Sequence, residues 1–314
     1  MAEDEYINEL SRALGIRQRN LLERDILLHQ LLKELSRHPL FSERCLFKGG
    51  TCLIKGYTGY GRFSVDLDFT WREQGLTRDM TGSERAAYIS ERILEFGRLL
   101  EEVAQKLHLD FRFVKSDEKY VLIREGGKYC KFKLWFHSTM TDTDEIVKVE
   151  VNFVELLCFT PTVKDFRSLI TGKNHEVMSL FPDYSWYEEV VTLPAYTIEE
   201  ITCEKVRAIF TRHTVKARDI FDIYLISTQC SVDVAALKEM IIEKILFSFS
   251  KHERSQEHYK RNRELILSEA YFSWGDEMRY LLVDLDEEAF FIFLQSFNQL
   301  LADLIEEIDC RLTT

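Results

Sequence analysis

The sequence predicts an α+β fold, in which an α/β part is followed by an α-helical part. Apolar and polar residues alternate over residues 62–70 and 145–153, which is the period of a strand with one buried face. Apolar residues recur at helical spacing in the first forty residues. The same spacing returns after Thr197-Ile-Glu-Glu200, which has the pattern of a capping box. The change of pattern near residue 195 predicts the boundary between the two parts.

Shorter signals divide the α/β part into elements. A glycine-bearing turn at residues 47–51 is followed by a short apolar helix that runs to about Tyr57. Thr81-Gly-Ser-Glu84 has the spacing of a capping box and predicts the start of a long helix. Residues 109–113 alternate as a strand does, and Gly126-Gly127 predicts a two-residue hairpin turn between two further strands.

The length of 314 residues allows one large domain or two of ordinary size. We expect N-terminal helices over residues 1–39 that pack on the core. An α/β domain is expected over residues 40–195, and a C-terminal helical domain over residues 196–314.

The composition argues against several classes of protein. No apolar run reaches the roughly 18 residues of a membrane span, and the acidic start does not have the pattern of a signal peptide. The seven cysteines are dispersed and form no C-x-x-C pair, which argues against a disulfide framework or a zinc ribbon and favours the cytoplasm. The net charge of −12 argues against general coating of nucleic acid but is compatible with a local basic groove.

The turn Phe47-Lys48-Gly49-Gly50-Thr51 has features of a phosphate site. Glycines let a phosphate approach the backbone, and the start of a helix offers unpaired N–H groups. A Gly-Gly turn before a helix is nevertheless more often only a turn. The pattern G-x-x-x-x-G-K-[ST] of a Walker A loop is absent.

Carboxylates on the two predicted strands are candidate ligands of a metal ion. Asp66 and Asp68 project from the same face of one strand, about 7 Å apart at the backbone. Like charges at this spacing repel each other unless a cation lies between them, and Mg²⁺ prefers such oxygen ligands. Glu150 lies on the polar face of the second strand. If the two strands are neighbours in the sheet, three carboxylates converge and could hold metal ions for a phosphoryl or nucleotidyl displacement. The alternative is a solvated strand face.

A basic segment follows in the helical part. Residues 205–218 contain five Lys or Arg and no acidic residue, which favours a groove for the phosphates of an NTP or for RNA. We expect Arg212 and Lys216 to contact RNA. Arg218 and Asp222 stand at i and i+4, so a simple helical ion pair is an equally good interpretation of that pair.

Two runs in this order resemble the AbiEii-type nucleotidyltransferase toxin family, which belongs to the DNA polymerase β-like superfamily. The first run is Phe47-Lys-Gly-Gly-Thr51 with Arg62-Phe-Ser-Val-Asp-Leu-Asp-Phe69. The second is Glu204-Lys-Val-Arg-Ala208 with Arg218-Asp-Ile-Phe-Asp-Ile-Tyr224. The resemblance covers residues from about 40 to 230. It implies a nucleotidyltransferase-like mixed sheet with flanking helices, followed by an α-helical bundle.

The resemblance also implies roles for individual residues. Nucleotide binding is implied for Lys48, Gly49, Gly50, Thr51, Ser64, Lys205 and Asp219. Catalytic roles are implied for Asp66, Asp68, Glu150, Lys205 and Asp222. Of these, Asp66, Asp68 and Glu150 would hold Mg²⁺ or Mn²⁺, and Lys205 would place a point charge on the triphosphate.

The implied activity is transfer of a nucleotide from an NTP to an acceptor. Some relatives modify the 3′ end of tRNA, and relatives include toxins of abortive-infection and type IV toxin–antitoxin systems, with an antitoxin encoded by a neighbouring gene. Two alternatives are a metal-dependent nucleotide phosphohydrolase with water as acceptor, and a non-catalytic module that binds nucleotide or RNA.

Overall fold

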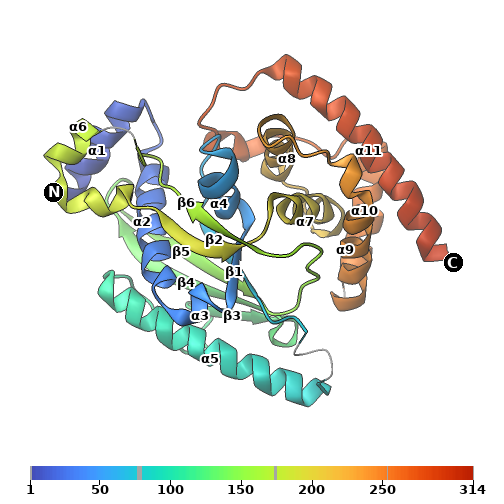
Figure 1. Ribbon diagram of the computed structural model, residues 1–314, viewed down its shortest axis with the longest axis horizontal. Coiled ribbons are helices and arrows are strands. Elements are labelled where there is room, and N and C mark those ends of the chain that lie inside the picture. Colours follow the sequence, from blue (N-terminus) through green and yellow to red (C-terminus); the bar gives the residue numbers. More distant parts are fainter. Residues whose placement is uncertain (1, 76–79, 173–174, 253, 314) are drawn as a thin grey trace. The chain divides into compact units, whose positions relative to one another are not determined.

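A computed structural model describes residues 2–75, 80–172, 175–252 and 254–313 (Figure 1). The chain forms two compact units. The first comprises Met1–Glu155 and Pro161–Tyr196, and the second comprises Leu156–Thr160 and Thr197–Thr314. The first unit contains a seven-stranded sheet with helices, whereas the second is helical. The predicted α+β class is therefore confirmed.

The sheet of the first unit is mixed, as the family resemblance implied. Its strand order is β3-β4-β5-β2-β1-β7-β6. The pairs β2–β5 and β1–β7 are parallel, and the other four pairs are antiparallel. The strands are β1 (Cys45–Lys48), β2 (Asp66–Trp71), β3 (Val121–Arg124), β4 (Tyr129–Ser138), β5 (Thr143–Asn152), β6 (Thr162–Phe166) and β7 (Val191–Ala195).

Aromatic residues join two helices of the first unit to the apolar face of this sheet. On strand β2 the aromatic side chain of Phe69 packs against Phe41 of α3, which in turn packs against Phe96 of α5. Because side chains alternate along a strand, Asp66 and Asp68 face the opposite side of the sheet. The helices are α1 (Ala2–Leu14), α2 (Arg19–Ser36), α3 (Pro39–Ser42), α4 (Gly49–Leu53), α5 (Gly82–Lys106) and α6 (His175–Leu180), and a π-helical turn follows α4 over Ile54–Thr58.

Three predictions about local structure need correction. The strand expected over 62–70 begins only at Asp66, because the register with β5 begins there. The hairpin of β3 and β4 is confirmed, but its turn is a 3₁₀ turn over Glu125–Gly127 with positive φ at all three residues. Residues 109–113 make a single bridge, between Asp110 and Trp135, where a strand was predicted. Their alternation reflects burial, since Phe111 and Phe113 both pack on Phe132.

The second unit has its own hydrophobic core, formed by apolar residues of all five of the helices listed next. These are α7 (Ile198–Thr211), α8 (Ala217–Gln229), α9 (Lys238–Lys251), α10 (Ser255–Leu267) and α11 (Glu287–Thr313). The segment Leu156–Thr160 belongs to this unit because Glu200 accepts hydrogen bonds from the backbone N–H groups of Cys158 and Phe159, at 2.9 and 2.8 Å. Across the described residues, no helix is long and apolar enough to cross a membrane.

Candidate active site

The glycine turn lies where the chain passes from β1 into α4. Gly49 has a φ of +76°, and a Cβ atom built on it would lie 2.2 Å from Asp68 Oδ2. A Cβ atom on Gly50 would lie 2.8 Å from Arg62 Nη2 and 3.0 Å from Ser64 Oγ. Only glycine fits at Gly49, where both the backbone conformation and the neighbouring carboxylate exclude a side chain. The turn and the carboxylate strand therefore form one compact assembly.

Gly49→Ala is expected to reduce nucleotide transfer strongly, because the new methyl group must displace the Asp68 carboxylate. Gly59→Ala is the matched control: Gly59 also has a positive φ, of +70°, but nothing lies within 4 Å of its Cβ position. Both variants should lose about 1–3 kcal/mol of stability from the backbone conformation. Thermal unfolding and transfer rates of the two variants check this. Equal activity in both would show that the position of Asp68 does not matter.

Thr51 and Ser64, both expected to bind nucleotide, are neighbours. Thr51 Oγ1 lies 2.8 Å from Ser64 Oγ and donates a hydrogen bond of 2.5 Å to the backbone oxygen of Asp66. The Thr51 side chain is buried, whereas Ser64 is partly exposed. Thr51 therefore holds the start of β2 against α4, and Ser64 is the better placed of the two to reach a ligand.

The three candidate metal carboxylates lie at adjacent positions on one face of the sheet. Strands β2 and β5 are parallel neighbours, with Asp68 directly opposite Glu150. The sequence analysis required these two strands to be neighbours if the three carboxylates were to converge. The structure shows that they are neighbours. Tyr129 of β4 is hydrogen-bonded to Glu150. Burial first, and then the charges of Glu150, Asp68 and Asp66, raise the pKa of the Tyr129 hydroxyl far above its usual value. The Tyr129 hydroxyl is therefore close enough to all three carboxylates for their charges to raise its pKa.

Two lysines that the sequence analysis did not single out share this face. Lys148 Nζ lies 3.3 Å from Asp66 Oδ1, and Lys131 Nζ lies 2.9 Å from Glu150 Oε1. Apart from this ion pair, Asp66 Oδ1 is shielded from solvent and accepts no hydrogen bond within the described part of the chain. The strand alternation had already placed both lysines at polar positions, which is the signal that could have found them.

The carboxylate oxygens of this face are of the kind that a divalent cation prefers. Among the described residues, no three His, Cys, Asp or Glu side chains are grouped so as to hold a metal ion. The oxygens of Asp66, Asp68 and Glu150 are nevertheless the hard ligands that Mg²⁺ prefers, and Asp66 Oδ1 is a shielded oxygen without a hydrogen bond. Lys148, 3.3 Å away, is the cationic group that this oxygen faces in the structure.

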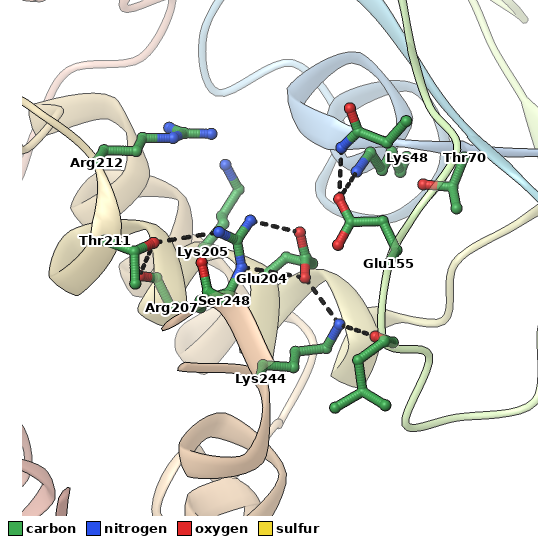
Figure 2. A network of polar contacts seen from close by, with 12 residues as sticks. Lys48, Thr70, Glu155, Glu204, Lys205, Arg207, Thr211, Arg212, Lys244 and Ser248 are labelled. Atoms are coloured by element: carbon green, nitrogen blue, oxygen red, sulfur yellow. Dashed lines mark hydrogen bonds and ion pairs between the residues drawn. The ribbon is translucent and has the colours of Figure 1, made fainter. Parts of the chain in front are cut away.

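Lys48, which was expected to bind nucleotide, has a protein carboxylate as its partner. Its Nζ lies 3.0 Å from Glu155 Oε1, and Asn152 donates a hydrogen bond to the same oxygen (Figure 2). The ammonium group also lies 5.6 Å from the ring centre of Tyr196. Glu155 was not anticipated from the sequence. The arrangement ties the end of β1 to the segment after β5, next to the glycine turn.

In the second unit, Lys205 of α7 lies between two aspartates of α8. Its Nζ lies 2.9 Å from Asp219 Oδ1 and 2.5 Å from Asp222 Oδ2. The Lys205 side chain is 8% exposed and that of Asp222 is not exposed at all. Burial raises the pKa of Asp219, but the charges of Arg212 and Lys205 outweigh burial and hold that pKa well below its usual value.

Other residues of the basic segment also have acidic partners. Arg218 lies 3.6 Å from Glu277, and Asp222 lies 2.5 Å from Lys205. Arg212, about half exposed, is paired with Asp219. Arg207 contacts Glu204, which also binds the buried Lys244 (Figure 2). Lys216 precedes α8 and is partly exposed.

Comparison with known proteins places the chain in a family. The family described as "Nucleotidyl transferase AbiEii toxin, Type IV TA system" matches residues 30–302. The chain belongs to this family. The resemblance seen in the sequence is thereby confirmed. Membership makes the chain a nucleotidyltransferase by family and an NTP its substrate class, and a toxin–antitoxin system implies an antitoxin as a partner.

Two solved structures are distantly similar to this chain. JHP933 from Helicobacter pylori has 19% sequence identity and a TM-score of 0.43, over 93% of this chain and 96% of that one. A proposed nucleotidyltransferase from H. pylori has 18% identity and a TM-score of 0.44, over 91% and 96%. A search of curated proteins found no match. Family membership therefore rests on the match over residues 30–302.

Proposed function

We propose that this AbiEii-family protein uses Mg²⁺ or Mn²⁺ to transfer a nucleotide from an NTP to the 3′ end of tRNA, in the cytoplasm. The observation that carries the proposal is the register of β2 and β5, which sets Asp68 opposite Glu150 and beside Asp66. The close approach of the Gly49 backbone to Asp68 joins this carboxylate face to the glycine turn.

In this proposal, the residues of the first unit have three different roles. Gly49, Gly50 and Ser64 seat the triphosphate, because the two glycines have no side chains of their own to block the approach of a phosphate to the backbone. Asp66 and Asp68 hold the cation, which neutralises the charge that develops on the phosphates. Glu150 completes the set and accepts the proton of the acceptor hydroxyl.

In the second unit, Lys205 and Asp219 were both expected to bind nucleotide, and each has a partner of opposite charge. The Lys205 ammonium group already has two aspartate partners, and Asp222 is fully buried. We therefore assign Asp222 and Asp219 the role of holding Lys205 in place, and Lys205 that of a fixed positive charge for the triphosphate. A role for Asp222 as a base toward the acceptor is not supported by this burial.

Incubation of the protein with labelled NTPs, tRNA and Mg²⁺ tests the activity. Label in the RNA supports transfer. Labelled pyrophosphate and monophosphate without labelled RNA would show a phosphohydrolase, and binding with no product would show a non-catalytic module. Addition of EDTA is expected to stop the reaction, and activity that survives EDTA would rule out the metal assignment.

The proposed tRNA surface includes Arg212 and Lys216. With four or five phosphate contacts, affinity for tRNA should fall by roughly a hundredfold or somewhat less between 50 and 200 mM salt. Lys216→Glu together with Arg212→Gln should flatten this dependence, whereas Lys260→Glu, at an exposed position of α10, should not. Glutamine is used at 212 because a glutamate there would face Asp219. A filter-binding titration against salt measures the slopes, and an unchanged slope would remove RNA from this surface.

A further inference from the structure

The lysines beside the carboxylates have no role in the proposed function. Lys148 lies 3.3 Å from Asp66 and Lys131 lies 2.9 Å from Glu150, measured between the ammonium nitrogen and the nearer carboxylate oxygen. These are two of the three carboxylates to which the cation was assigned. The lysines are thus placed where they interact with the same oxygens as the cation would.

Strand register fixes this arrangement. Lys148 is the partner of Asp66 across β2 and β5, and Lys131 is the partner of Glu150 across β4 and β5. The four side chains are between 19% and 35% exposed. Charges that are partly shielded from water interact more strongly than fully exposed ones, while a flexible lysine stem still lets the ammonium group change partner.

We propose that Lys131 and Lys148 are positioning residues that compete with the divalent cation for Asp66 and Glu150, so that the site disfavours free cation and favours cation bound together with a triphosphate. The proposal rests on the proposed function. A carboxylate that already faces an ammonium group gains less from a cation, and the ammonium group repels that cation. A triphosphate offers the two ammonium groups new anionic partners.

Cation and nucleotide should therefore bind cooperatively, and by linkage each should raise the affinity of the other by the same factor. Removal of one lysine should weaken the coupling between cation and nucleotide. Without that lysine, the carboxylate can bind the cation without first giving up an ammonium group. If the lysine had only a structural role, its removal would leave the affinity for free cation unchanged or lower it. Competition with the cation instead predicts a higher affinity for free cation after removal.

The chain provides a matched control in Lys133. It lies on β4, two residues from Lys131 and directly opposite Lys148 in the register. Its ammonium group, however, donates a hydrogen bond of 2.6 Å to the backbone oxygen of Glu118. Lys133→Met therefore removes a lysine of the same face without removing either carboxylate ion pair.

Binding of free Mn²⁺ to the full chain, followed by electron paramagnetic resonance, tests the competition. Lys148→Met and Lys131→Met should each tighten Mn²⁺ binding on the order of tenfold, from the Coulomb interaction at this distance. Lys133→Met should change it less than about twofold on the same basis. Unchanged or weaker binding in both Lys148→Met and Lys131→Met would overturn the proposal.

A second titration separates failure of this inference from failure of the proposed function. Binding of an NTP analogue that cannot be cleaved between its α- and β-phosphates is measured with and without Mn²⁺. The wild-type protein should show strong coupling and Lys148→Met weaker coupling; equal coupling would overturn the inference. Asp66→Asn should abolish binding of free Mn²⁺ in the Lys148→Met background. If it does not, the metal assignment to Asp66 has failed, and the lysine proposal fails with it for that separate reason.

Discussion

Asp66→Ala is expected to lower nucleotide transfer by roughly a thousandfold or more, which corresponds to the several kcal/mol that a bound metal ion contributes to such a reaction. Asp66 lies at the start of β2, on the face of the sheet opposite Phe69, and its Oδ1 is shielded from solvent and lies 3.3 Å from Lys148 Nζ. In the proposed function, its removal takes away one of the carboxylates that hold the cation.

The fold should survive this substitution. The ion pair of Asp66 with Lys148 is partly exposed, and pairs of that kind contribute less than about 1 kcal/mol. Loss of one of two like charges on the strand also relieves repulsion of Asp68. The variant should therefore unfold within a few degrees of the wild-type protein.

A labelled-NTP transfer assay together with thermal unfolding checks both expectations. Asp165→Ala is the control, because Asp165 is exposed on β6, three strands from β2 in the sheet order, where it accepts a hydrogen bond of 2.7 Å from Thr192 on the neighbouring strand. It should keep full activity. Mg²⁺-dependent transfer by Asp66→Ala at the wild-type rate would contradict the metal assignment.

The carboxylate face was largely predictable because it depends on strand alternation. A period of two residues fixes which side chains share a face, so Asp66, Asp68 and Glu150 could be assigned to polar faces from the sequence. Which residues stand opposite each other is a different property. It depends on register, and a shift of the β2–β5 register by two residues would set Asp66 opposite Glu150 and remove Lys148 from its partner.

Other parts of the site depend on long-range packing and could not be predicted. Lys48 meets Glu155 across more than a hundred residues of sequence, and no local pattern indicates that pair. The alternation of residues 109–113 was mistaken for a strand because aromatic burial against Phe132 produces the same period as pairing does. The closeness of Gly49 to Asp68 is likewise visible only once α4 packs on β2.

Lys205, Asp219 and Asp222 were all singled out from the sequence. That they lie buried together was not predicted. A run of basic residues is usually a solvated helix face, and the sequence offered no measure of how α7 and α8 pack. In the structure the ammonium group is enclosed by Asp219 and Asp222. Substitution of Lys205 should therefore affect stability as well as catalysis.

Lys205→Ala is expected to destabilise the protein by about 3–5 kcal/mol, because it removes a buried ammonium group from its ion pair with the fully buried Asp222. If Lys205 acts on the triphosphate as proposed, the substitution should also raise the apparent KM for NTP and lower the rate, because the charge then acts in both the ground state and the transition state. Lys205→Arg should restore activity only in part, because a planar guanidinium does not replace a compact ammonium group.

Denaturant unfolding of a double-mutant cycle separates the two effects. In Lys205→Met with Asp222→Asn the buried negative charge is gone, so the double variant should be more stable than Lys205→Met alone. Its transfer activity should remain low, because the positive charge is still missing. Lys238→Ala is the control in the same unit: its pair with Glu307 is about one third exposed and should contribute less than about 1 kcal/mol. If Lys205→Ala costs no more than Lys238→Ala and keeps wild-type kinetics, Lys205 neither supports the helical unit nor acts on the triphosphate.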